Sequence, residues 1–217
     1  MSAAQAVLFE APEPPQKRKQ DFATAALADP LKIRKNDTYE TPDCATRALL
    51  RVQRLPRRIW EPACGPGAIV RVLRAAGHQV IATDLVDYGC EDSTSRVDFL
   101  METVAPAKTL VTNPPFKNAN EFVRHGLQLC DTVVMLLRLA FLEGAQRSDL
   151  IDRHLDRVWV GRERLPMMHR PGWDGPIITE SAMPYAWFVF RKAPRNRPIR
   201  LQRMSWRDPV GGANERG

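Results

Sequence analysis

The segment Asn113-Pro114-Pro115-Phe116 follows a run of strand-forming residues, and its composition is unusual for a solvated loop. Proline fixes φ, lacks a backbone donor and keeps the preceding residue extended. The Asn113 side chain and the Pro114 carbonyl are therefore expected to be hydrogen-bond acceptors on a rigid corner, beside an aromatic ring. Such a corner suits a ligand that brings N–H donors. The alternative is a proline-rich turn in which Phe116 covers the core.

A second group of candidate residues lies upstream, in the sequence EPACGPG at positions 61–67. Gly65 and Gly67 permit a tight turn whose backbone approaches a ligand closely. The next apolar run ends at Asp84, near the spacing at which an acid binds ribose hydroxyls. The third glycine of the dinucleotide-binding pattern is missing, and the carboxylate of Glu61 favours a cationic ligand over a pyrophosphate. The pattern predicts a nucleoside site with a positively charged group.

Short apolar runs alternate with helical stretches throughout the middle of the chain. Strands are expected at 58–62, 79–84, 96–99, 109–113, 132–137, 157–160 and 184–191, and helices after Thr41 and at 68–76, 119–129 and 148–154. Thr41 is the expected N-cap of its helix, with Pro42 at the first helical position. This alternation predicts an α/β domain with a doubly wound, mainly parallel sheet. Ligands of such sheets bind at the carboxyl ends of the strands, where both candidate groups lie.

Four motifs, EPACGPG, ATDL, VDFL and NPPF, occur in this order and resemble those of class I S-adenosylmethionine-dependent methyltransferases. More narrowly, they resemble small phage- and prophage-type N6-adenine DNA methyltransferases, over residues 37–192. The resemblance implies a Rossmann-like, seven-stranded sheet with an antiparallel last strand, and S-adenosylmethionine as cofactor. It implies cofactor contacts from Tyr39, Thr41, Glu61, Pro62, Ala63, Gly65, Gly67, Asp84, Leu85, Asp98, Phe99 and Asn113.

The same resemblance implies a role for each motif. The first motif contacts the methionine part of the cofactor, and residues 39–42 close over it. Asp84 contacts the ribose, Asp98 hydrogen-bonds the adenine amino group, and Phe99 packs near that ring.

The NPPF motif is typical of methyl transfer to an amine conjugated with a ring, which is a poor nucleophile. The Asn113 oxygen and the Pro114 carbonyl would accept both N–H groups and favour a tetrahedral nitrogen, while Pro115 keeps the corner rigid. Phe116 would stack on a base that has left the duplex. Adenine N6 in DNA is the favoured acceptor. RNA, cytosine N4 and a protein glutamine amide are alternatives, as is a non-catalytic nucleic-acid-binding domain.

Candidate contacts to nucleic acid lie in the loop 165–183 and in the C-terminal segment. From Arg191 onward the chain has eight Lys/Arg and two Asp/Glu, a pattern that suits phosphate contacts, with a solvated tail as the alternative. The candidate side chains are Lys117, next to the NPPF motif, Arg164, just before the loop, and His169, Arg170 and Trp173 within it; the alternative is a surface loop with Trp173 packed on the sheet. The chain has no room for a separate target-recognition domain, so short loops, the basic arms or a protein partner would supply target recognition.

The 217 residues are enough for one domain, expected at 37–192, between a flexible arm at 1–36 and a basic tail at 193–217. No apolar run is long enough to span a membrane, and the N-terminus does not read as a secretory signal. The four cysteines are scattered without a CxxC pair, so neither a disulfide framework nor a metal site is expected. A cytoplasmic location fits these features.

Overall fold

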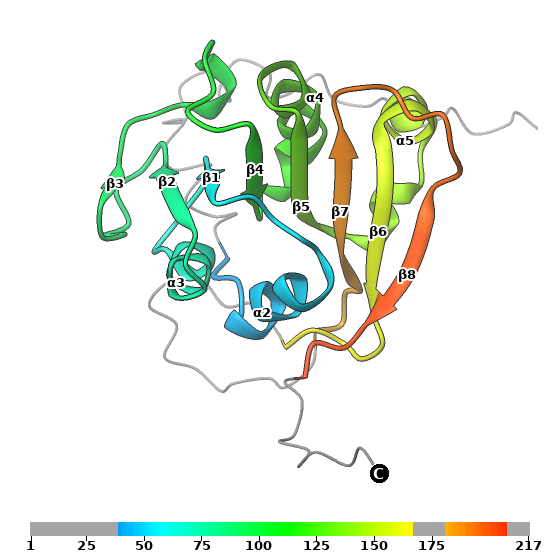
Figure 1. Cartoon of the computed structure of the whole chain (residues 1–217), viewed down its shortest axis with the longest axis horizontal. Helices are drawn as coiled ribbons and strands as arrows, with labels where there is room; N and C mark the ends of the chain where they lie inside the picture. Colours follow the sequence, from blue (N-terminus) through cyan, green and yellow to red (C-terminus); the bar gives the residue numbers. More distant parts are fainter. Residues whose placement is uncertain (1–38, 167–180, 208–217) are drawn as a thin grey trace, which may run out of the picture.

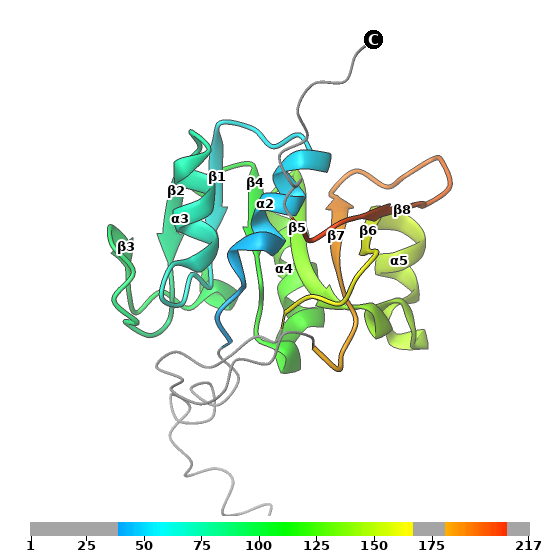
Figure 2. The same ribbon diagram turned by 90° about the horizontal axis from the view of Figure 1, so that it is seen from below.

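The computed structural model describes residues 39–166 and 181–207, which form one eight-stranded sheet with helices on both faces (Figures 1 and 2). The strand order is β3-β2-β1-β4-β5-β7-β6-β8. Strand β7 alone among the described strands runs antiparallel to its neighbours, β5 and β6. The strands are β1 (Arg58–Glu61), β2 (Gln79–Thr83), β3 (Ser93–Thr94), β4 (Thr109–Thr112), β5 (Thr132–Arg138), β6 (Leu155–Gly161), β7 (Tyr185–Arg191) and β8 (Arg200–Met204). The predicted doubly wound, mainly parallel sheet with an antiparallel seventh strand is confirmed.

Two layers of helices bury the two faces of the sheet. Helices α2 (Asp43–Val52) and α3 (Ala68–Ala75) cover one face, and α4 (Ala119–Leu129) and α5 (Ser148–His154) cover the other (Figure 2). Alternate residues of β5 enter different cores: Val134 and Leu136 pack with α2 and α3, whereas Val133 and Met135 pack with α4 and α5. A strand buried on both sides must be apolar throughout, which explains its continuous hydrophobic sequence. Short 3₁₀ helices connect these elements: η2 (Phe99–Met101), η3 (Phe116–Asn118), η4 (Leu139–Leu142) and η5 (Ala145–Arg147).

The third strand differs from the prediction of a strand at 96–99. The structure has only the two-residue β3, and Arg96 takes a left-handed φ of 63°, which a strand does not allow. The Asp98 carboxylate then accepts a hydrogen bond from the Leu100 amide at 3.1 Å and starts η2. A local hydrogen bond to the Asp98 side chain therefore takes the place of the backbone hydrogen bonds of a strand in this segment.

The sheet also continues beyond residue 192, where the sequence predicted a tail. Strand β8 pairs in parallel with β6, so the sheet has eight strands and not the expected seven. Trp206 follows β8 and is 2% exposed; its indole lies so close to Gly161 that a Cβ there would collide with it. The Arg51 guanidinium of α2 donates to the carbonyls of Ser205 and Arg207 at 2.9 and 3.0 Å. Residues 200–207 are therefore part of the folded domain, and Met204 and Trp206 are part of its core.

Within the described ranges, no helix is long and apolar enough to cross a bilayer. The expected arm at 1–36 and the residues from 208 onward lie outside those ranges.

Candidate active site

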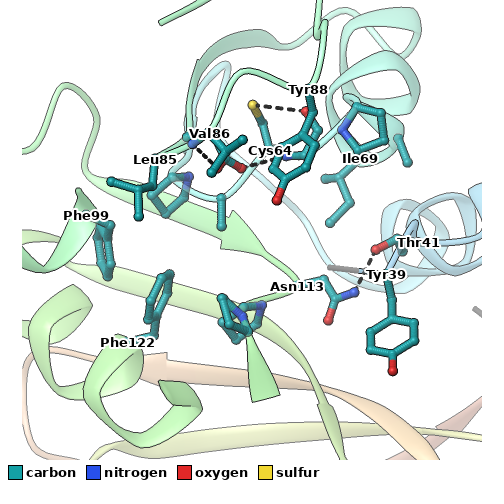
Figure 3. A pocket seen from close by; sticks show the side chains of 18 of the residues that line it. Tyr39, Thr41, Cys64, Ile69, Leu85, Val86, Tyr88, Phe99, Asn113 and Phe122 are labelled. Atoms are coloured by element: carbon teal, nitrogen blue, oxygen red, sulfur yellow. Dashed lines mark hydrogen bonds between the residues drawn. The ribbon is translucent and has the colours of Figure 1, made fainter. Parts of the chain in front are cut away.

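A cleft opens at the carboxyl ends of β1, β2 and β4 and gathers the four motifs (Figure 3). Predicted residues that line it are Tyr39, Thr41, Pro62, Ala63, Gly65, Asp84, Leu85, Asp98, Phe99, Asn113, Pro114, Pro115 and Phe116. The cleft has two ends: Asn113, Thr41 and Tyr39 lie on one side of it, and Leu85, Phe99 and Phe122 lie on the other. The motifs follow the carboxyl ends of strands that run parallel to one another. The topology of the sheet therefore brings together segments that are far apart in sequence.

Glu61, the last residue of β1, is 1% exposed. It was predicted to contact the cofactor, but it does not line the cleft, whereas the next two residues, Pro62 and Ala63, do. Among the described residues, neither of its carboxylate oxygens has a hydrogen-bond partner. Burial raises the pKa of Glu61 well above 4.5; the nearby Thr112 hydroxyl opposes this, and the negative charge of Asp84 adds to it. A buried acid without a partner is costly to the folded protein, so its presence favours a ligand that brings a cationic donor.

The raised pKa of Glu61 makes the stability of the ligand-free protein dependent on pH. The folded state holds the proton more tightly than the unfolded chain, so the free energy of unfolding falls as pH rises from about 4.5 through the raised pKa. Each pH unit in that window costs up to about 1.4 kcal/mol. Glu61→Gln has no titrating group at this position. We therefore expect its free energy of unfolding, measured with urea at pH 5, 7 and 9, to fall less with rising pH than that of the wild type. Identical pH dependence in both proteins would contradict the assignment.

Gly67 and Gly65 shape the turn of the first motif. Gly67 takes a φ of 88° and Gly65 a φ of 52°, both in the left-handed region. A Cβ on Gly67 would lie 2.7 Å from the Cys90 sulfur, so a side chain is excluded there by contact as well as by conformation. Gly67 is the N-cap of α3 and does not line the cleft, whereas Gly65 does.

Asp84 joins the first two motifs. Its Oδ2 accepts the Gly65 amide at 2.8 Å, and its Oδ1 accepts the Val86 amide at 3.0 Å. Each carboxylate oxygen can accept more than one hydrogen bond, so these contacts leave capacity for ribose hydroxyls. Asp84 therefore holds the glycine turn in place as well as lining the cleft.

The far end of the cleft is an aromatic pocket. Phe99 is 2% exposed, and its ring lies 4.7 Å from that of Phe122 and 5.2 Å from that of Trp60, measured between centroids. The edge of His125 completes the cluster at 5.0 Å, although the sequence gave no reason to place it there. Sequence reasoning also missed Phe122, because an apolar residue on the buried face of a helix is normally predicted to belong to the hydrophobic core. Glu40, Cys64 and Pro66 also line the cleft, within segments that were predicted to contact the cofactor; the other lining residues that sequence reasoning missed are Ala68, Ile69, Val86, Tyr88, Val97 and Asn118.

Asn113 is held by a residue 72 positions away. Its Nδ2 donates to the Thr41 hydroxyl at 3.0 Å, which turns the Asn113 carbonyl oxygen away from Thr41 (Figure 3). The prediction of Thr41 as an N-cap was wrong: α2 begins at Asp43, Pro42 takes the cap position, and no side chain caps the helix. The Thr41 hydroxyl orients the Asn113 amide instead.

Phe116 forms an aromatic wall at the mouth of the cleft. Its ring lies 5.7 Å from Tyr39 with an interplanar angle of 28°, and 5.8 Å from Tyr185. The Arg138 guanidinium lies over the same ring at 4.5 Å. Arg138 and Tyr185 are cross-strand partners on β5 and β7. They lie on strands that read as core, so the sequence offered no signal for either.

The predicted nucleic-acid contacts are dispersed. Lys117 is exposed in η3 outside the lining of the cleft, and Arg164 is exposed and donates to the Ala182 carbonyl at 3.4 Å. His169, Arg170 and Trp173 lie outside the described residues. Over the ranges that the structure covers, no group of His, Cys, Asp and Glu could hold a metal ion.

Comparison with solved structures shows that this fold is similar to that of class I S-adenosylmethionine-dependent methyltransferases. One similar structure is a candidate enzyme of that class from Listeria monocytogenes, with 16% identity and a TM-score of 0.54 over 78% of this chain and 67% of that one. Another is a candidate RNA methyltransferase from Pyrococcus horikoshii, with 11% identity and a TM-score of 0.52 over 74% of this chain and 89% of that one. No family model matches the sequence, and no curated protein matches it significantly.

The residues of the cleft fit S-adenosylmethionine as the cofactor. Glu61 does not line the cleft, but its buried carboxylate follows directly on to Pro62 and Ala63, which do, and its charge would suit a cationic amino group. The Asp84 carboxylate lines the cleft and is an acceptor that ribose hydroxyls could use. Phe99 and Phe122 offer an aromatic surface beside Asp98, which an adenine could contact.

Proposed function

We propose that this chain is a methyltransferase that uses S-adenosylmethionine to methylate the N6 amine of adenine in DNA. The observation that carries the proposal is the orientation of Asn113, whose amide nitrogen donates to the Thr41 hydroxyl in the lining of the cleft. The carbonyl oxygen is thereby presented as an acceptor, next to the rigid backbone of Pro114. Two acceptors at one point suit an amine with two N–H groups.

The residues of the chain prepare the amine for reaction. S-adenosylmethionine supplies an electrophilic methyl group when it is bound. Acceptance of both N–H bonds by Asn113 and Pro114 draws the nitrogen lone pair out of conjugation with the ring and stabilises the positive charge that develops there. Phe116 provides an apolar surface against which a base taken out of the helix can stack. The methylated nitrogen then loses one proton to water, so none of the three residues needs to change its protonation state.

The direct test is expression in a host that lacks DNA methylation, followed by mass spectrometry of the nucleosides from its DNA and RNA. The expected result is N6-methyladenine in DNA above the level of an Asn113→Ala control. N4-methylcytosine in DNA, or methylated bases in RNA alone, would overturn the choice of acceptor. If no nucleic acid is methylated although the purified protein binds the cofactor, the acceptor is to be sought among glutamine amides of proteins.

Asp84→Asn is expected to weaken cofactor binding. The change removes the charged acceptor for the ribose, and it sets an amide donor against one of the amides of Gly65 and Val86. A hydrogen bond to a charged group is worth about 1.5–3 kcal/mol, which corresponds to roughly a 10- to 150-fold rise in Kd. Titration calorimetry measures this, with Asp87→Asn, on the loop that follows β2, as the control. Equal Kd values for the wild type and Asp84→Asn would contradict the assignment of Asp84 as the residue that binds the ribose.

A further inference from the structure

A basic hollow lies at the end of the sheet opposite to the cleft. It is lined by Asp131, Asp156, Arg191, Lys192, Ala193, Pro194, Arg195, Asn196 and Arg197. Thr132 pairs with Arg191 where β5 begins, whereas Arg138 beside Phe116 marks the other end of the same strand. The hollow and the cleft are therefore separate sites, at the two ends of β5.

The hollow is built by specific contacts. Asp156 is 3% exposed, and its Oδ1 accepts from the Arg197 Nη2 at 2.8 Å while its Oδ2 accepts from the Arg200 Nη2 at 2.6 Å. The Arg195 amide donates to the Arg153 carbonyl at 2.7 Å, and the Lys192 amide donates to the Asp131 carbonyl at 3.0 Å. The loop between β7 and β8 is thus fixed at both ends and presents its cations together.

Positive charge is in excess around this hollow. Residues 191–207 contain seven Lys/Arg and no acid, and the acids that line the hollow are Asp131 and Asp156. Asp156 is already shared by two guanidiniums. Burial lowers the pKa of the neighbouring Arg157, and the charges of Arg200 and Arg197 lower it further while Asp156 opposes them, as expected from mutual repulsion among the cations. An anion would relieve this repulsion.

Arginine presents a planar fork of donors that matches the oxygens of a phosphate. Arg191, Lys192 and Arg197 are exposed, so a large ligand can reach them. We propose that the hollow binds backbone phosphates of the nucleic acid on which the enzyme acts, as an anchor remote from the cleft. The phosphate site rests on the proposed function in one respect, that the nucleic acid bound there is also the methyl acceptor.

The position of the hollow sets a minimum length for that polymer. Strand β5 has seven residues, which at roughly 3.3 Å each separate its ends by about 20 Å. Duplex DNA advances about 3.4 Å per base pair, so at least about six base pairs are needed to reach both sites. Longer acceptors should therefore gain affinity from the hollow, and shorter ones should not.

The test compares two double variants that remove equal charge. Lys192→Gln with Arg195→Gln alters the hollow, and Arg47→Gln with Arg54→Gln alters exposed positions on α2 and the loop after it. Binding of a labelled 20-base-pair duplex, a 20-nucleotide RNA and a 4-base single strand is measured by fluorescence anisotropy between 50 and 200 mM salt. Urea unfolding and cofactor titration confirm that each variant is folded.

The hollow variant is expected to lose about 10-fold or more in affinity for the duplex. The slope of log K against log salt should fall by roughly 1–2, since each lost phosphate contact contributes about 0.9. Its affinity for the 4-base strand, and the control variant's affinity for all three probes, should change less than twofold. No loss in the hollow variant, or an equal loss in both variants, would overturn the proposal. A loss seen only with a 20-nucleotide RNA would keep the hollow as a phosphate site and overturn DNA as the acceptor.

Discussion

Asn113→Ala is expected to lower the rate of methyl transfer by roughly 10²–10³-fold at saturating cofactor, the loss typical of removing one preorganised hydrogen-bonding group from a transition state. The variant keeps the backbone acceptor of Pro114 but loses the side-chain oxygen that the Thr41 contact orients. Cofactor affinity should stay within about threefold, because Glu61, Asp84 and the aromatic pocket are untouched. Single-turnover transfer of a labelled methyl group measures the rate, and titration calorimetry measures the affinity.

The Thr41 contact supplies a graded control for this prediction. Thr41→Val keeps the shape of the side chain but removes the hydroxyl that Asn113 Nδ2 binds, so the amide can turn, and the rate should fall about tenfold. Thr41→Ser restores the hydroxyl and should recover most of the rate. If Asn113→Ala transfers methyl groups as fast as the wild type, the amide is not a catalytic group.

Trp206→Ala is expected to destabilise the protein by about 3–5 kcal/mol, the usual cost of truncating a large buried aromatic side chain. Trp206 is 2% exposed and packs directly on the backbone of Gly161, where a Cβ would collide with the indole. Urea unfolding at neutral pH measures the loss. Leu201→Ala on the preceding strand is the matched control: its side chain is 62% exposed, and it should change stability by less than about 0.5 kcal/mol.

The same reasoning applies to the boundary of the domain. A chain that ends after Lys192 lacks β8, Met204 and Trp206, and it should not unfold cooperatively. A chain that ends after Arg207 keeps all three and should unfold as the full chain does. Cooperative unfolding of the shorter chain with unchanged stability would show that β8 is dispensable.

The sequence alone determined the class of the fold and the position of the main motifs. Strands such as Thr132–Arg138 are apolar throughout because helices cover both faces, and this pattern is visible without a structure. The glycine turn after β1, the acid after β2 and the proline corner after β4 are local signals, since each depends on the conformation of a few adjacent residues. For this reason the cleft could be predicted motif by motif.

Features that depend on distant contacts were decided only by the tertiary structure. The bond between Asn113 and Thr41 joins residues from two separate elements, and it overrode the local preference of Thr41 for a helix cap. Phe122, Arg138 and Tyr185 border the site from elements whose sequences indicate only burial. Composition indicated a basic tail outside the domain after residue 192. Residues 200–207 belong to the domain instead, because β8 pairs with β6, Trp206 is buried, and Arg197 and Arg200 bind Asp156. These contacts exist only once the sheet has formed.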